Sequence, residues 1–154
     1  NVAAMLIAFV GLVALADFAL GFVSFAGAPL SLSRVLGWLF SPLAFAMGIP
    51  WSEAATVGGL LGEKIVLTEF IAYIHLGELM AAPTPVLSER SAIIASYALC
   101  GFANFGSLGI LLGGLATLVP ERRAELLSIG PRSLLSGTIV TCNTGAIVAL
   151  VTLL

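Results

Sequence analysis

The chain has 154 residues, of which 60% are hydrophobic and 9% are charged, and its formal net charge is −2. Because a soluble domain carries about 25% charged residues, this composition excludes a soluble globular domain and predicts a polytopic membrane protein. The small net charge excludes a basic nucleic-acid-binding surface. The sequence has no nucleophile with its base, no metal-ligand cluster and no glycine-rich phosphate loop, so we expect neither an enzyme nor a cofactor site.

Residues 1–28 are apolar at nearly every position, and Asp17 carries their only charge. About 20 apolar residues span the hydrocarbon core of a bilayer, so we predict a transmembrane helix over 1–28. Asp17 is either a functional carboxylate or a residue at a water-facing or helix-packing position, and we favour the second. The chain begins without an initiating Met, a basic n-region or a small-residue cleavage site, so we expect a piece of a longer polypeptide.

Residues 29–50 are interrupted by proline. Because proline removes a helical donor and clashes with the preceding turn, we predict pieces too short to span, cut at Pro29, Pro42 and Pro50. Ser31 or Ser33 can cap the helix that follows, and Trp38 suits a membrane interface where its ring is half wet. We predict a helix that lies along the membrane surface or packs against neighbouring subunits.

Residues 51–82 contain six of the chain's 15 ionisable side chains. As one straight helix, about 30 residues would run about 45 Å and would hold a glutamate near the bilayer centre, at a cost of about 3 kcal/mol. Two short helices that meet near residues 66–69 would instead enter the membrane halfway and return, with Glu69 at the tip. A carboxylate at that depth indicates a functional site, and half-helices that meet at the midplane form substrate sites in many secondary transporters.

Residues 91–119 form a second predicted spanning segment with an unusual middle. Three glycines and two hydrogen-bonding side chains stand there, where a lipid-facing helix would have Leu or Val. The glycines alone are often packing residues, but a buried amide must find partners. Asn104 and Ser107, three positions apart, share a helix face. Backed by Phe102 and Phe105, they predict a small pocket wall or a local break in the helix.

Residues 120–132 are predicted to be a loop, and they hold three arginines, half of the basic residues in the chain. By the positive-inside rule this loop is cytoplasmic. The first helix then runs outward, the surface helix and both feet of the hairpin lie outside, and the Asn104 segment runs inward. The last predicted helix, 133–154, runs outward with a polar stripe that more often serves helix packing, formed by Thr138, Thr141, Asn143 and Thr144.

Three stretches resemble the concentrative nucleoside transporters. Residues 62–76, GEKIVLTEFIAYIHL, resemble the family's Gly-x-Lys…Asn-Glu-Phe-Val-Ala signature. Residues 88–115, with their Phe-Ala-Asn-Phe core, and residues 36–54 resemble the flanking segments in the same order. The resemblance implies half of an all-α, inverted-repeat transporter, with a re-entrant helical hairpin over 51–82 and a broken transmembrane helix over 91–119. It also implies a homotrimer that imports nucleosides such as uridine across the inner membrane by elevator-like movement of a transport part.

The resemblance also implies which residues bind substrate. Glu69 matches the hairpin-tip carboxylate that binds the ribose hydroxyls, Asn104 and Ser107 match broken-helix residues that hold the ribose, and Phe102 matches the aromatic residue that packs on the base. The physical chemistry agrees, because a carboxylate accepts from two vicinal hydroxyls in charge-assisted bonds and an amide both donates and accepts. An aromatic face suits a planar base.

Two positions near these residues depart from the family pattern. Thr68 stands where the signature usually has Asn, and it keeps a hydrogen-bonding group on a shorter side chain. We include Thr68 among the expected substrate-binding residues. Gly106 stands where Ser is often found.

We expect Na⁺ rather than H⁺ as the coupling ion, because no acidic residue beyond Glu69 is clearly placed to carry a proton. The family's cation ligands belong to a first hairpin that has no counterpart in these residues. A channel or passive pore in which Glu69 and Asn104 line a water path stays open as an alternative. A structural or oligomerisation piece whose polar groups satisfy one another is a third interpretation. A preference for purine or pyrimidine nucleosides does not follow from these residues.

Two further polar residues of the hairpin are not named as site residues. Lys64 either pairs structurally, with Glu69 across the turn or with neighbours of Glu63, or contacts the substrate directly, and we favour structural pairing. His75 either relays protons or is simply hydrogen-bonded in place.

Overall fold

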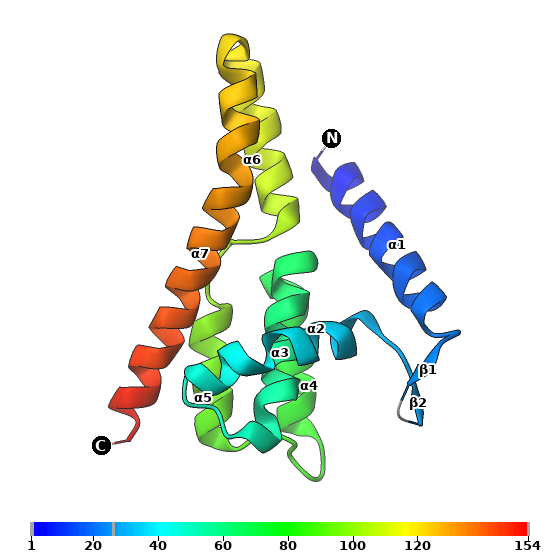
Figure 1. Ribbon diagram of the computed structural model, residues 1–154, viewed down its shortest axis with the longest axis vertical. Helices are drawn as coiled ribbons and strands as arrows, with labels where there is room; N and C mark the ends of the chain where they lie inside the picture. Colours follow the sequence, from blue (N-terminus) through cyan, green and yellow to red (C-terminus); the bar gives the residue numbers. More distant parts are fainter. Residues whose placement is uncertain (1, 26, 154) are drawn as a thin grey trace.

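The computed structural model describes residues 2–25 and 27–153. It is all-α apart from two short antiparallel strands, β1 (Ser24–Phe25) and β2 (Ala28–Pro29). The helices in chain order are α1 (Val2–Leu20), α2 (Leu32–Ala46), α3 (Trp51–Val66), α4 (Glu69–Ala81), α5 (Glu89–Leu99), α6 (Phe105–Leu118), the 3-10 turn η1 (Pro120–Arg122) and α7 (Arg123–Val151). In Figure 1, α7 runs along the long axis with α6 beside its first part and α5 beside its last part, while α1 stands apart.

The helix predicted over residues 1–28 is shorter than expected. It ends at Leu20, and β1 and β2 follow instead of further helix. Gly27, with φ of 81°, lies in the turn between the strands, where a residue with a Cβ atom would be strained. Asp17 accepts a hydrogen bond of 2.5 Å from the backbone N–H of Leu32, the first residue of α2. Asp17 therefore stands at a helix-packing position and satisfies one of the free N–H groups at the start of α2.

The prediction that Pro42 would cut the 29–50 segment is wrong, because Pro42 lies inside α2. The helix starts as expected, with the Ser31 hydroxyl accepting from the backbone N–H of Arg34 at 3.2 Å. It continues past Pro42 because one face of α2, including Ser41 and Ala44, is buried against α3. The burial of that face compensates for the hydrogen bond that proline cannot donate.

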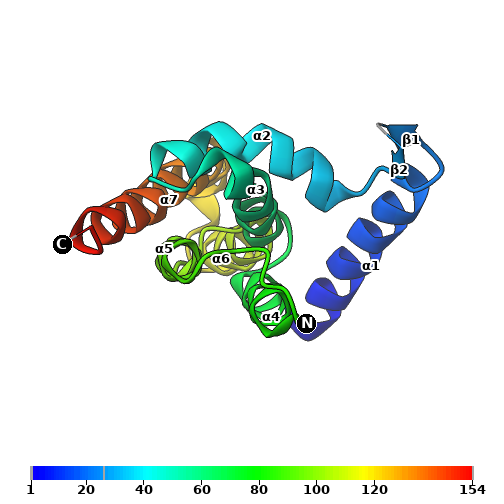
Figure 2. The same cartoon turned by 90° about the horizontal axis from the view of Figure 1, so that it is seen from below.

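The helices α2 and α3 cross closely, with a bend of 117° between them, and Figure 2 shows α2 beside α3, on the side away from α4. Glycine permits this approach. A Cβ atom added to Gly58 of α3 would lie 2.6 Å from the carbonyl oxygen of Gly37 in α2, and one added to Gly62 would meet the Leu36 side chain. No larger side chain fits at these two positions unless α2 moves away from α3.

The segment predicted as a hairpin, residues 51–82, is two helices with a break at Leu67 and Thr68. Its foot is tied to the start of α5, because the backbone N–H and the hydroxyl of Ser88 both donate to Glu53 Oε2 at 3.1 Å. We call α3, α4 and their connection the hairpin.

The 91–119 segment has the local break that was one of the two sequence interpretations. Residues 100–104 leave the helix between α5 and α6, and we call them the central break. The loop predicted over 120–132 is wrong, since η1 and α7 occupy these residues and Pro131 lies inside α7. Good helix formers over 124–127 and an Arg122–Glu125 ion pair of 2.7 Å explain the early start of this helix.

The core lies where α2, α3, α5 and α7 meet. Its buried apolar side chains include Ala44, Ile49, Val57, Leu61, Ile94, Leu99 and Cys142. Among the described residues, Pro120–Val151 is by length and composition able to cross a membrane, and the bent pair α2 and α3 meets the same criterion as one broken span. The first arm of the hairpin belongs to this core, and the central break packs on α7 through Gly101 and Thr141.

Candidate functional site

The tip of the hairpin meets the central break through one hydrogen bond. Asn104 Nδ2 donates to Glu69 Oε2 at 2.8 Å, although the two residues are 35 positions apart. Asn104 is 1% exposed, and its Oδ1 accepts from the backbone N–H of Ser107 at 2.7 Å. Because a backbone N–H can only donate, the amide must present its oxygen to Ser107 and its nitrogen to the carboxylate.

Two helices begin at this contact. Glu69 is the first residue of α4, and Asn104 is the N-cap of α6. A helix N-terminus carries a partial positive charge and free N–H groups, so both helices favour negative charge here. The Glu69 carboxylate therefore lies where the N-termini of two helices meet. Asn104 occupies one acceptor position of Glu69, and the remaining lone pairs of the carboxylate can accept from a ligand.

A cavity of about 550 Å³ lies elsewhere, between α2, α3 and α4, and a second cavity of about 420 Å³ adjoins Asn104. The second is lined by Phe102, Asn104, Ser107 and apolar residues of α6 and α7. The Phe102 side chain is 78% exposed, so its ring face is available to a planar group. An amide, a hydroxyl and an aromatic ring around such a space can hold a polar ring compound by hydrogen bonds and stacking.

Residues 1–149 match the family model described as "Na+ dependent nucleoside transporter C-terminus". The chain belongs to this nucleoside transporter family. This result confirms the resemblance seen in the sequence, and it identifies the chain as part of an all-α membrane transporter rather than an enzyme.

Individual relatives agree with the family match. The chain is 43% identical over 149 residues to the uncharacterized transporter YutK of Bacillus subtilis, covering 96% of this chain and 36% of YutK. It is 42% identical over 142 residues to the nucleoside permease NupC of Helicobacter pylori, covering 90% of this chain and 34% of NupC. The chain therefore spans about a third of the length of these relatives.

A solved transporter structure has the same fold. CNTnw in an inward-facing substrate-bound state superimposes with a TM-score of 0.85 at 40% identity, covering 97% of this chain and 37% of CNTnw. This agreement extends to the broken helices as well as the long ones, because the superposition covers nearly the whole chain.

Within this nucleoside transporter chain, the structure brings together most of the site residues predicted from sequence. Phe102, Asn104 and Ser107 line one cavity, and Glu69 contacts Asn104. Thr68 is the N-cap residue of α4 and makes no capping hydrogen bond with its side chain. Glu69 and Thr68 are half-buried and do not line that cavity. Their binding roles stay predictions, and so does the identity of the coupling cation.

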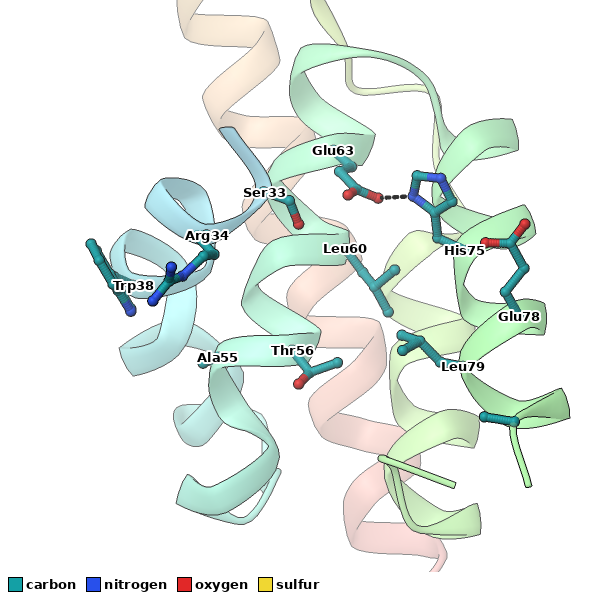
Figure 3. Close-up of a pocket in the computed structure, with 11 residues that line it drawn as sticks. Ser33, Arg34, Trp38, Ala55, Thr56, Leu60, Glu63, His75, Glu78 and Leu79 are labelled. Atoms are coloured by element: carbon teal, nitrogen blue, oxygen red, sulfur yellow. Dashed lines mark hydrogen bonds and ion pairs between the residues drawn. The ribbon is translucent and has the colours of Figure 1, made fainter. Parts of the chain in front are cut away.

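The larger cavity contains none of these predicted residues. Figure 3 shows Glu63 of α3 and His75 of α4 pointing toward one another across it, with His75 Nδ1 and Glu63 Oε2 2.7 Å apart. Arg34 of α2 lies over the Trp38 ring at 5.5 Å. His75 is thus hydrogen-bonded in place, as one of its two sequence interpretations stated, and it joins the two arms of the hairpin.

Sequence reasoning missed the partners of two residues in the hairpin. Lys64 forms no ion pair with Glu69 in the described part of the chain. Its Nζ donates instead to the carbonyl oxygen of Ala98 at 3.0 Å and to Thr141 Oγ1 at 2.7 Å. The Tyr73 hydroxyl donates to the carbonyl oxygen of Ser96 at 2.6 Å. A lysine within a membrane segment indicates that hydrogen-bond acceptors lie nearby. Nothing in the sequence indicates which backbone carbonyl groups these are.

Proposed function

We propose that the transporter containing this chain imports nucleosides across the cytoplasmic membrane, driven by a sodium gradient. The observation that carries the proposal is the contact between Glu69 and Asn104, made where two helices begin. It joins the hairpin tip to the central break and leaves acceptor positions of a carboxylate open to a ligand. The matches to a nucleoside permease and to a substrate-bound transporter structure support the same substrate class.

Ribose recognition follows from the chemistry of these groups. The vicinal 2′ and 3′ hydroxyls of a ribose are two donors side by side, and a carboxylate accepts both in charge-assisted hydrogen bonds. Asn104 already fixes one side of the Glu69 carboxylate, so the ligand meets a preorganised acceptor rather than a mobile chain. Ser107 and the exposed ring of Phe102 line the cavity beside Asn104, the partner of Glu69, and suit the remaining hydroxyl and the base.

Helix lengths support a re-entrant placement of the hairpin. The arms α3 and α4 have 16 and 13 residues, which correspond to about 24 and 20 Å of helix. Each is shorter than the roughly 30 Å hydrocarbon core, so neither arm crosses alone. The helices α5 and α6, on either side of the central break, have 11 and 14 residues. Neither is long enough to cross the hydrocarbon core alone, but together they are. Glu69 and the central break would then lie near the same depth, within the membrane.

Several parts of the proposal concern the transporter beyond this chain. We infer that the cation ligands lie in the two thirds of the relatives' length that this chain does not span, and that the protein forms a homotrimer. An elevator-like movement of a transport part agrees with a rigid unit in which hairpin, α5, α6 and α7 pack together. The inner membrane is the expected location.

Replacement of Glu69 by Gln tests the proposal in the full-length protein. Glutamine keeps the shape but loses the charge and one pair of acceptor sites, so we expect uptake of labelled uridine and adenosine to fall about 100-fold or more, since hydrogen bonds to charged groups are worth about 1.5–3 kcal/mol each. The matched control is Glu78→Gln on the exposed face of α4, which we expect to transport at the parent rate.

The assay uses proteoliposomes with sodium and pH gradients applied separately. Saturable uptake that follows the sodium gradient supports the proposal, and uptake that follows only the pH gradient replaces sodium by protons. Non-saturable flux that ignores both gradients would indicate a channel. Parent-rate transport by Glu69→Gln would end the assignment of Glu69 to the ribose.

A further inference from the structure

The most deeply buried cationic side chain of the described residues is not used by the proposed substrate site. Lys64 of α3 is 1% exposed. Its Nζ lies between the C-terminal end of α5 and the middle of α7. Both of its contacts are acceptors, the Ala98 carbonyl and the Thr141 hydroxyl, and Thr141 in turn donates to the carbonyl of Thr138 at 3.0 Å. A buried lysine persists only where such partners compensate for lost hydration.

The end of α5 needs these partners because the helix stops early. The last carbonyl groups of a helix have no N–H of their own helix to accept from, and the central break begins immediately after Leu99. Lys64 of α3 donates to Ala98, and Tyr73 of α4 donates to Ser96. The C-terminal end of a helix also carries a partial negative charge, which favours a cation there. We call Lys64 and Tyr73 together the α5 clamp, one residue from each arm of the hairpin.

The α5 clamp lies directly beside the chain that carries Asn104. Gly101 of the central break packs so closely on Thr141 that an added Cβ atom would overlap the Thr141 methyl group, and the same position is 3.8 Å from Lys64 Nζ. Asn104 follows Gly101 by three residues, and Glu69 follows Lys64 by five. The same hairpin is therefore joined to the chain on both sides of the central break, to the end of α5 through the α5 clamp and to Asn104 through Glu69.

We propose that the α5 clamp is a positioning device. It holds the hairpin, the end of α5 and α7 together, and thereby keeps Asn104 within hydrogen-bond distance of Glu69 and sets the affinity for nucleoside without contacting it. The inference rests on the proposed function, since nucleoside affinity is the quantity that it predicts. Thr141 belongs to the polar stripe predicted on the last helix, and in this device it is the acceptor on α7 for Lys64.

The test compares Thr141→Val with Thr141→Ser in the full-length transporter. Valine has nearly the same shape as threonine but leaves Lys64 without its acceptor on α7, whereas serine keeps the hydroxyl. We expect Thr141→Val to raise the Kd and KM for uridine about tenfold or more, the effect of about one hydrogen bond to a charged group, with a smaller change in kcat. Thr141→Ser should restore the parent values. Thr144→Val is the control, because that exposed hydroxyl donates only to Val140 of its own helix.

Tyr73→Phe provides a second, milder variant in case Thr141→Val does not fold. It removes one hydroxyl from a half-buried ring, and we expect a raised Kd for uridine with the thermal midpoint little changed. A lowered thermal midpoint with a parent Kd, in either folded variant, would show a merely structural contact and overturn the inference. Parent protein that binds neither uridine nor adenosine would instead overturn the proposed function, and this inference with it.

Discussion

Asn104 serves two helices with one amide group. Its oxygen caps α6 through Ser107, and its nitrogen donates to Glu69 at the start of α4. The side chain is buried, so a replacement that leaves either partner unsatisfied costs free energy. The same residue therefore contributes to stability through the cap and to the site through the carboxylate, and the two contributions can be separated by choosing the substitution.

Serine and alanine at position 104 separate them. Serine is a good N-cap but too short to reach Glu69, whereas alanine removes both interactions. We expect Asn104→Ala to lower the free energy of unfolding about 1 kcal/mol more than Asn104→Ser, seen as a lower thermal midpoint of the full-length protein. Both variants should weaken uridine binding about tenfold or more. Parent affinity in Asn104→Ser would contradict a binding role for the amide.

At the scale of helices, the crossing of α2 over α3 supports the hairpin. The buried face of α3 includes three glycines, at 58, 59 and 62, and all three pack on α2. At Gly58 the approach is limited by backbone atoms of α2, so the crossing cannot adjust to added volume there without moving α2. The rigidity of this crossing helps to hold the first arm of the hairpin, which carries Lys64.

Gly58→Ala and Gly77→Ala provide a matched pair on the two arms. The added methyl of Gly58→Ala would lie 2.6 Å from the Gly37 carbonyl oxygen, whereas that of Gly77→Ala on α4 meets nothing within 4 Å. We expect Gly58→Ala to destabilise by about 1–3 kcal/mol through overpacking and Gly77→Ala to stabilise by up to about 1 kcal/mol through helix propensity. Thermal unfolding in detergent measures both. An equal or higher midpoint for Gly58→Ala would show that α2 is free to shift.

At the scale of the whole molecule, α7 is held at two separate levels. Near its middle, Thr141 accepts from Lys64. Eight residues further along, about 12 Å of helix, the carbonyl of Ala149 accepts from Arg90 Nη2 at 2.8 Å, and Arg90 Nη1 donates to the carbonyl of Gly48 at 3.0 Å. Both contacts join α7 to α5 and to the α2–α3 region, but only the first adjoins the central break.

This arrangement predicts that the Arg90 contact stabilises the fold without affecting the site. We expect Arg90→Met to lower the thermal midpoint, because two backbone carbonyls lose charge-assisted partners, and to leave the Kd for uridine within about twofold, well below the tenfold loss of a charged hydrogen bond. Arg123→Met, at an exposed position at the start of α7, should change neither quantity. An increase in Kd for Arg90→Met as large as that for Thr141→Val would mean that any loosening of α7 reaches the site.

Part of this architecture follows from local chemistry. A glutamate in an oily stretch indicates a break near residues 66–69, because a charge is costly where it stands in the membrane. The glycine-rich centre around Asn104 indicates either a pocket wall or a local break in the helix. The positions of Glu69, Asn104, Ser107 and Phe102 beside one another follow from the family pattern. The structure has both the break at the hairpin tip and the contact between Glu69 and Asn104.

The amino-acid sequence by itself determined the membrane class and the break near Glu69, because composition, charge and backbone preference are properties of single residues and their close neighbours, and its motifs determined the family. Only the tertiary structure decided that Pro42 and Pro131 lie within helices, that Asp17 caps α2, and which groups Lys64 reaches. The partners of Lys64 are 34 and 77 residues away, and one is a backbone carbonyl that every residue possesses. Such contacts depend on which surfaces the packed helices bring together, and no local pattern encodes them.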